Sequence, residues 1–245
     1  MISRCAILKI TRYILPIVII VSLTGCNSQQ SIEEKYKAVM MRLYGPSPKQ
    51  LVKDMFESPD ADVRRNAIER LSQYDWARRG AYVKAYAMLT EDPDPTVRSA
   101  AVRALGRCGD VHYADKVIER LTDISAIVRQ DAAVVLGSLI VPSAIKPLMQ
   151  RSLGDDSVDV RIAAVRALGS YPTRDVLNTL IKCLDDEDFS VRFEAAESLR
   201  RLTGRNIGID VDRWREVISS VSNPFKKPAR PKKKSWWQRF SSRQK

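Results

Sequence analysis

The chain has 245 residues, of which 44% are hydrophobic and 29% are charged. This composition excludes a chain that is disordered throughout, and its length allows one sizeable folded unit with appendages. The net charge of +12 lies at the ends, because residues 226–245 carry nine cations and no acid and residues 1–25 carry three cations. The stretch 26–225 is therefore neutral, which argues against a broad basic face for double-stranded nucleic acid.

The first 25 residues have the pattern of an export signal. Three cations precede an apolar run, residues 13–21, which is shorter than a membrane span of about 20 residues and fits a signal-peptide core. The run leads to Leu-Thr-Gly-Cys at 23–26, which resembles the bacterial lipoprotein lipobox. The resemblance implies that Cys26 carries the lipid and anchors the mature protein in the bacterial cell envelope, with residues 26–31 as a tether. An uncleaved anchor and a cleaved soluble form are the alternatives.

A Val-Arg pair then recurs five times, at intervals of 31 to 34 residues. Each Val is followed by Ala at the fourth position and Leu at the eighth, so the three side chains share one helical face. Each Val is preceded at the third position by Asp or Ser, residue types that cap helix N-termini. The valines are Val63, Val97, Val128, Val160 and Val191, and the capping residues are Asp60, Asp94, Ser125, Ser157 and Asp188.

A second amphipathic segment precedes each later copy, so the repeat has two helices. These segments are residues 81–90, 113–123, 144–153 and 175–185. Three copies have Gly after the Leu (Gly106, Gly137 and Gly169), where we expect the helix to stop in a left-handed cap. Helices that cannot bury their apolar stripes alone must stack, so the pattern predicts an α-solenoid.

The pattern D-x-x-V-R-x-x-A-x-x-x-L-G resembles the short HEAT-like repeats of phycobilin lyase subunits, over residues 47–204. The resemblance implies an all-α solenoid of about five two-helix repeats, in which Val, Ala and Leu form the core. It also implies that the arginines form polar ladders with nearby aspartates, as structural residues. These arginines are Arg64, Arg98, Arg129, Arg161 and Arg192.

The solenoid is expected to fill residues 32–223, with a capping helix at each end. Residues 32–44 lack the Val-Arg pair and are expected to form the N-terminal cap. The segment from Leu202 to Trp214 resembles the closing segment of bacterial HEAT-like proteins, which implies that Trp214 covers the last apolar face.

Residues suited to catalysis are scarce. His112 is the single histidine and is expected to be a solvated turn residue, while Cys108 and Cys183 are expected to be buried apolar residues. The sequence has no G-x-S-x-G, phosphate-loop or G-x-G-x-x-G motif. We therefore predict no enzyme activity, metal, cofactor or small-molecule substrate. A lyase-type subunit is the alternative, and it depends on the family resemblance alone.

The surface that varies between repeats is the expected binding surface. Positions two and six after each Val become partly apolar along the chain, which predicts a groove for a helix or an extended peptide of a protein partner. The groove residues are Val134, Ile162, Arg166 and Phe193. The alternatives are an ordinary mixed surface and a structural spacer between the lipid anchor and an anionic surface.

Residues 224–245 form a basic tail, which is expected to be disordered because three prolines break it and nine cations lack acidic partners. Tryptophan and cations together suit an anionic membrane surface. The residues expected to make this contact are Lys232, Lys233, Lys234, Trp236, Trp237, Arg239 and Phe240. Single-stranded nucleic acid, which an exported protein seldom meets, and a merely solubilising tail are the alternatives.

Overall fold

The computed structural model describes residues 35, 39 and 45–225, and these residues form helices and no strand. The chain divides into two compact units, residues 1–53 and 54–245. In the first unit, the described residues include the start of α3 (Pro48–Glu57), and of the predicted N-terminal cap only residues 35 and 39 are described, both helical. The predicted signal peptide, Cys26 and residues 226–245 lie outside the described part.

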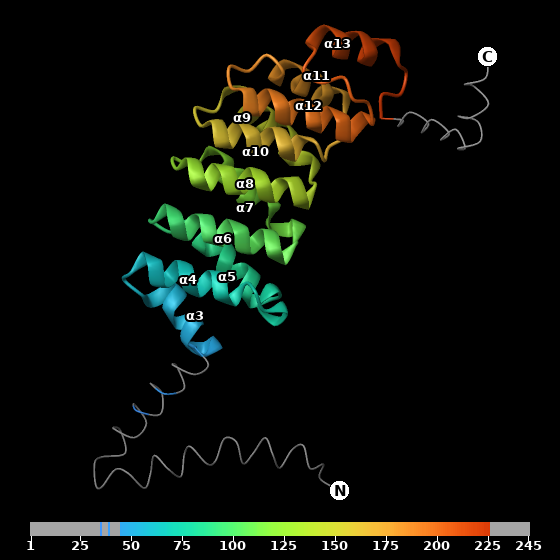
Figure 1. Cartoon of the computed structure of the whole chain (residues 1–245). Helices are drawn as coiled ribbons and strands as arrows, with labels where there is room; N and C mark the ends of the chain where they lie inside the picture. Colours follow the sequence, from blue (N-terminus) through green and yellow to red (C-terminus); the bar gives the residue numbers. More distant parts are fainter. Residues whose placement is uncertain (1–34, 36–38, 40–44, 226–245) are drawn as a thin grey trace, which may run out of the picture. The chain divides into compact units, whose positions relative to one another are not determined.

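In the second unit the helices alternate between two layers (Figure 1). The helices that carry the Val-Arg pairs form one layer, called here the Val-Arg layer: α4 (Ala61–Leu71), α6 (Pro95–Cys108), α8 (Ala126–Leu139), α10 (Val158–Leu168) and α12 (Phe189–Thr203). The companion layer is formed by α5 (Ala81–Leu89), α7 (Ala114–Glu119), α9 (Ile145–Gly154) and α11 (Arg174–Cys183), and α13 (Val211–Ser220) follows α12. Short 3-10 helices lie in the connections: η1 (Asp75–Arg78), η2 (Val111–Tyr113), η3 (Arg120–Thr122) and η4 (Pro142–Ala144).

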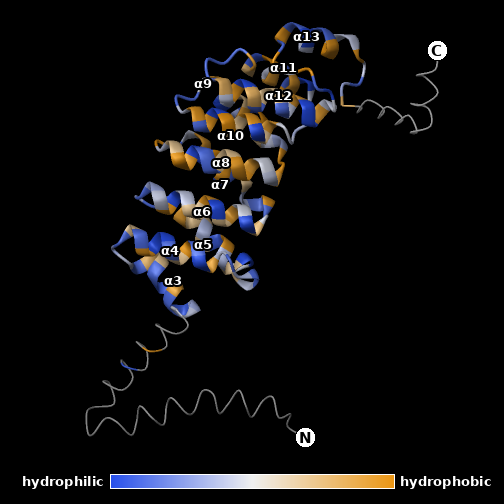
Figure 2. Ribbon diagram, viewed as in Figure 1, coloured by the Kyte–Doolittle hydropathy of each residue, from blue (hydrophilic) through white to orange (hydrophobic). Residues whose placement is uncertain are grey.

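The core lies between and within these layers, where each Val-Arg helix packs against the next one and against its companion helices. Apolar and polar residues alternate along the helices (Figure 2). The Ala and Leu of every repeat are at most 2% exposed, and the Val of the last four repeats is fully buried. Val63 is 38% exposed, because α4 is the first helix of its layer and packs mainly against α6. The predicted core is thus confirmed, except at Val63.

Trp214 on α13 covers the last apolar face of the solenoid, as the resemblance of the closing segment implied. Trp214 is fully buried, and its indole Nε1 donates a hydrogen bond of 2.8 Å to the carbonyl oxygen of Gly208. A buried indole with its donor satisfied covers apolar surface without a desolvation cost for the N–H group.

The predicted start of each Val-Arg helix is confirmed, although only the aspartates act through their side chains. The carboxylates that accept helix N–H groups belong to Asp60, Asp94 and Asp188. Ser125 and Ser157 stand at the same position without a capping bond from the hydroxyl. The aspartate two residues earlier accepts the serine N–H group, at 2.9 Å for Asp123 and 3.0 Å for Asp155. The equivalent aspartates accept the N–H groups of Asp94 and Asp188 in the same way.

The prediction that three glycines end helices in left-handed caps is wrong. α6 and α8 continue through Gly106 and Gly137, and Gly169 caps α10 in a right-handed conformation with φ of −60°. The left-handed caps belong to three residues further along the chain: Gly109, Ile140 and Gly204.

Gly106 and Gly137 instead allow neighbouring Val-Arg helices to approach closely. A Cβ atom at Gly137 would lie 3.0 Å from the Cα atom of Ala167 on α10. A Cβ atom at Gly106 would lie 2.6 Å from the Cγ2 atom of Val135 on α8. The repeated glycine is therefore a packing residue, which the spacing alone could not distinguish from a cap.

Candidate protein-binding surface

Four of the five Val-Arg arginines form the same ion pair with the following repeat. In each pair Nε and Nη2 donate to the two carboxylate oxygens of an aspartate that stands five residues before the next Val, as a bidentate interaction. The pairs are Arg64–Asp92, Arg98–Asp123, Arg129–Asp155 and Arg161–Asp186. Their closest N–O distances are 2.7 to 2.9 Å, and none of these side chains is more than 12% exposed. We call these pairs the rungs of the Arg–Asp ladder.

In the Arg98–Asp123 and Arg129–Asp155 rungs the pKa values of both groups are shifted. Burial acts to raise the pKa of Asp123 and Asp155, but hydrogen bonds from arginine and from a backbone N–H outweigh it, so both pKa values are lowered. The hydrogen bond to the aspartate raises the pKa of Arg98 and Arg129 in turn. The Arg98–Asp123 and Arg129–Asp155 rungs are therefore fully charged at neutral pH.

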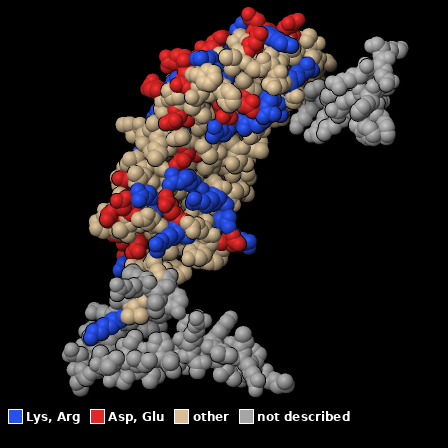
Figure 3. Space-filling model, in the orientation of Figure 1, with Lys and Arg blue, Asp and Glu red and all other residues tan. Residues whose placement is uncertain are grey.

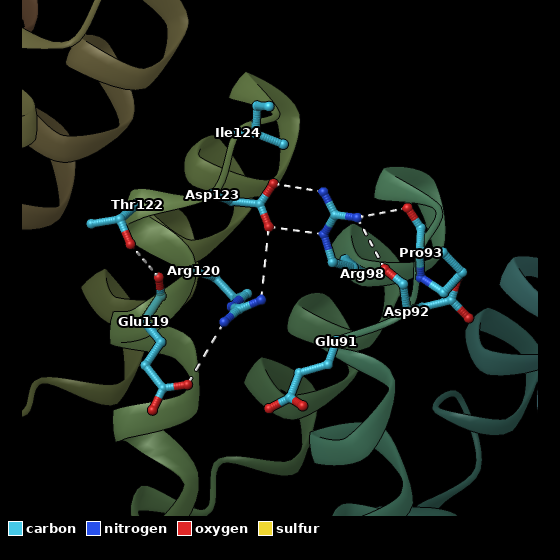
Figure 4. Close-up of a pocket in the computed structure, with 9 residues that line it drawn as sticks. All are labelled: Glu91, Asp92, Pro93, Arg98, Glu119, Arg120, Thr122, Asp123 and Ile124. Carbon is cyan, nitrogen blue, oxygen red and sulfur yellow. Dashed lines mark hydrogen bonds and ion pairs between the residues drawn. The ribbon is translucent and has the colours of Figure 1, made fainter.

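A shallow hollow of about 440 Å³ lies beside the second rung (Figure 4). Arg98 points from α6 toward Asp123. Its Nη1 donates to the carbonyl oxygens of Asp92 and Pro93, each at a distance of 3.0 Å. Arg120 lies on the other side of the hollow, 3.9 Å from Asp123. The remaining charged side chains of the lining also have ion-pair partners. Because these charges already neutralise one another, we interpret the hollow as part of the contact between two repeats and not as a ligand site.

A second charged network crosses the outward face of the Val-Arg layer. Arg103 on α6 contacts Glu69 on α4 at 2.7 Å and Asp131 on α8 at 2.5 Å. Further along the stack, Arg166 on α10 contacts Glu194 on α12 at 2.9 Å. In both cases position six after Val on one helix meets position three on the next.

This network has a gap between α8 and α10. The equivalent positions are Val134, six residues after its Val, and Ala163, three residues after its Val. The side chain of Val134 is left 50% exposed. Figure 3 shows the corresponding band of uncharged atoms across α8, with charged side chains gathered over the helices on either side. This face therefore carries an apolar strip at Val134, with ion-paired side chains on both sides of it.

Two phenylalanines extend the apolar strip at the start of α12. Phe189 and Phe193 are 60% and 54% exposed, and their rings stack with centroids 6.2 Å apart. The guanidinium of Arg192 lies over the Phe189 ring, 5.5 Å from its centroid. Exposed aromatic side chains beside arginine are typical of the residues that dominate protein interfaces.

A family model described as HEAT repeats matches residues 48–137 and 145–209, which is more than half of the chain. The chain belongs to the HEAT-repeat family. A HEAT repeat-containing taxis protein of Halobacterium salinarum is 33% identical over 159 residues, which cover 58% of this HEAT-repeat protein and 39% of the relative's own length.

Solved structures share the fold at lower identity. A chain in the complex of CpcE and CpcF of phycocyanin lyase from Nostoc is 22% identical, with a TM-score of 0.57 over 72% of this chain and 71% of that one. A designed armadillo repeat protein in complex with the peptide (KR)4 is 20% identical, with a TM-score of 0.50 over 71% and 90%. These likenesses confirm the α-solenoid.

The structure places the predicted groove residues of this HEAT-repeat protein on three successive helices of the Val-Arg layer. Val134 lies on α8, Ile162 is half-buried on α10, and Phe193 lies on α12. Arg166 is exposed, but it is held by Glu194. Sequence reasoning missed the contribution of Phe189, although its spacing of four residues from Phe193 puts both rings on one face of α12.

Ser99 stands two residues after Val97, one of the varying positions that are expected to form the binding surface, and this expectation is wrong for Ser99. Its side chain is 1% exposed, and its hydroxyl donates to a carboxylate oxygen of Asp131 over 2.6 Å. A small hydroxyl side chain fits between α6 and α8 because a carboxylate on the neighbouring helix accepts its hydrogen bond.

Little reactive chemistry is present in residues 45–225. No group of three or more His, Cys, Asp or Glu side chains that could hold a metal occurs in the described part of the chain. His112 is exposed, with its Nδ1 2.7 Å from a carboxylate oxygen of Asp110. Burial raises the pKa of the Cys108 and Cys183 thiols to about 11, so neither is a reactive thiolate at neutral pH. Among the helices of the described residues, none has the length and apolar character needed to span a bilayer.

Proposed function

We propose that this HEAT-repeat protein is an envelope lipoprotein that holds a protein partner on the apolar strip of the Val-Arg layer. The gap in the charged network between α8 and α10 carries this proposal, because Val134 and Ala163 stand where the neighbouring repeats have an ion pair. A partner that covers Val134, Ile162 and Phe193 gains the free energy of burying their exposed apolar surface, about 25 cal/mol per Å² before the cost of association.

The flanking ion pairs favour a defined register for the partner. The flanking charges are already paired, Arg103 with Asp131 and Arg166 with Glu194. A partner therefore need not neutralise them and gains little by contacting them alone. The apolar strip then supplies affinity and the charged borders limit where the partner sits. Binding in this fold has a precedent in the designed armadillo neighbour, which was solved with a peptide in place.

The envelope location rests on residues outside the described part. The lipobox at 23–26 supports lipidation of Cys26, and the cations and tryptophans of residues 226–245 support a second, electrostatic contact with an anionic membrane. Replacing Cys26 by Ser should move the protein from the membrane fraction to the soluble fraction. Unchanged fractionation and gel mobility of Cys26→Ser would overturn the lipoprotein part of the proposal.

The binding role is tested by photo-crosslinking in the native cell. A photoreactive amino acid at Val134 should give a discrete crosslinked species, whereas the same group at Lys146, an exposed position on α9 of the companion layer, should not. Adding Phe193→Asp should remove the crosslink formed at position 134. Equal crosslinking from both positions, or none from position 134, would contradict the proposed surface.

A further inference from the structure

The Arg–Asp ladder is open at its C-terminal end. In the first four repeats the guanidinium Nε and Nη2 are engaged by the aspartate of the next repeat. In the fifth repeat Arg192 keeps the loop contacts, with Nη1 donating to the carbonyl oxygens of Asp186 over 2.8 Å and Glu187 over 2.9 Å. No carboxylate of residues 45–225 pairs with its Nε or Nη2.

The unpaired nitrogens of Arg192 still reach water. Arg192 is half-buried, and its nitrogens are not among the buried polar atoms without a partner in the described part of the chain. The side chain is held in the same pose as the other ladder arginines by its two loop contacts. It therefore presents a preorganised pair of N–H donors, the geometry that binds a carboxylate through two parallel hydrogen bonds.

The orientation of α13 explains why the ladder stops here. Arg174, at the start of α11, donates to the carbonyl oxygens of Val221 and Ser222, which follow the end of α13. Arg215, in the first half of α13, lies 3.8 Å from Asp185, which follows the end of α11. α13 thus runs antiparallel to α11, and residues 221–225, which follow α13, lie at the edge of the stack where α11 begins, away from Arg192. No aspartate is delivered to the fifth arginine.

Two exposed aromatic rings adjoin Arg192 on α12, and the ring of Phe189 lies under its guanidinium. Phe189 precedes Arg192 in the sequence and Phe193 follows it. Their rings stack on each other, and both are more than half exposed. A carboxylate that pairs with Arg192 would therefore lie beside aromatic surface that its own neighbours could cover. Shielding from water by such rings strengthens the ion pair relative to one in open solvent.

We propose that Arg192, Phe189 and Phe193 bind a segment of a protein partner in which an aspartate or glutamate stands next to an apolar residue, and that this carboxylate supplies the missing rung. The proposal rests on the protein-binding function proposed above and names the chemistry of the partner.

Two other sources of the carboxylate are disfavoured by the sequence. A second copy stacked head to tail would present Ser58, since the first repeat has serine five residues before its Val where the later repeats have aspartate. Residues 226–245 contain no Asp or Glu side chain. Both points favour a segment of another protein.

Selection from a phage-displayed library of random dodecapeptides tests the site, with the full chain immobilised in detergent. The wild-type protein should enrich peptides with Asp or Glu beside an aromatic or branched aliphatic residue, and Arg192→Gln should lose the acidic enrichment. For a selected peptide made by synthesis, Arg192→Gln should weaken binding about tenfold to a hundredfold, as expected for a charge-assisted bidentate pair. Replacing the acid of the peptide by its amide should weaken it equally, and the two changes together should add little more.

Arg200→Gln is the matched control, because Arg200 is an exposed arginine on the same helix that pairs with Glu197 within α12. The affinity of Arg200→Gln for the selected peptide should stay within about twofold of wild type. Unfolding temperatures of both variants should stay closer to wild type than that of Arg98→Ala, since neither breaks a rung. Enriched peptides without acids, or equal affinity for Arg192→Gln, would overturn this inference and leave the protein-binding surface standing. Failure to enrich any peptide would also overturn it, whereas the proposed function is judged separately by crosslinking at Val134.

Discussion

Arg98 and Asp123 hold α6 to the loop before α8 through two parallel hydrogen bonds of 2.8 and 2.7 Å. Both side chains are nearly buried, with 11% and 4% of their surface exposed. Removing one partner of such a pair leaves the other charge buried and uncompensated, which costs far more than the net stabilisation of the pair. The rung therefore matters most as a condition for stacking one repeat on the next.

Arg98→Ala should destabilise the protein by about 3 kcal/mol, because Asp123 would lose its bidentate partner and keep only the more distant Arg120, at 3.9 Å, as a counter-charge. For a folded unit of this size that corresponds to a fall of roughly 6 to 12 °C in Tm. Thermal unfolding followed by circular dichroism measures it. Arg200→Ala is the control, with an expected loss below about 1 kcal/mol for an exposed pair. Equal losses in the two variants would contradict the structural role of the rung.

The rungs also make stability depend on pH. Although burial opposes it, arginine lowers the pKa of Asp123 in the folded state. A carboxylate with a lowered folded pKa contributes stability above its unfolded pKa of about 3.9, and this contribution is lost as the pH falls through the folded value. The Tm difference between wild type and Asp123→Asn should therefore be largest at neutral pH and shrink below about pH 4. Glu216→Gln, at an exposed position of α13, should show no such convergence.

How far the sequence predicts the fold is clearest at the Val-Arg helices. Val, Ala and Leu at positions zero, four and eight place three apolar residues on one face, so the core and the starts of the helices follow from spacing alone. Helix ends were predicted less well. Gly137 was expected to end α8, but the helix continues to Leu139. A glycine satisfies a left-handed cap and a close helix contact equally well, and only the position of the neighbouring helix distinguishes them.

Gly137→Ala should destabilise the protein by about 1 to 3 kcal/mol, because the new methyl group would meet the backbone of Ala167 on α10. Helix propensity acts in the opposite direction by about 1 kcal/mol, so the sign of the effect is informative. Gly154→Ala at the end of α9 is the matched control, since a Cβ atom there meets nothing within 4 Å. Urea unfolding should show Gly154→Ala to be neutral or stabilised. A stabilised Gly137→Ala would contradict close packing at this site.

Ile140 could not have been predicted as the C-cap of α8, because a β-branched residue rarely adopts a left-handed conformation. Its φ is 51°, and its side chain is 54% exposed. Ile140→Gly should relieve this strain and stabilise the protein by about 1 kcal/mol. Gly109→Ala, at the equivalent cap of α6 with φ of 67°, should destabilise the protein by about the amount that Ile140→Gly stabilises it. Changes of the same sign in both variants would contradict this account.

The candidate site was predictable only in part. Varying positions on the Val-Arg helices led to Val134 and Phe193, but the ion pairs that border them depend on register between neighbouring helices. Arg103 reaches Asp131 because position six of one helix faces position three of the next. A pattern of single repeats does not contain that relation. The reversed direction of α13 likewise appears only once the helices are packed.

The central claim, that the apolar strip between α8 and α12 holds the partner, is tested most directly by affinity. With the partner identified by crosslinking and purified, its Kd should rise at least tenfold for Val134→Asp, as expected when a charge is placed at the centre of an interface. Lys146→Asp, on α9, should leave the Kd within about twofold. A partner that binds Val134→Asp as tightly as wild type, or that loses affinity for Lys146→Asp instead, would contradict the account.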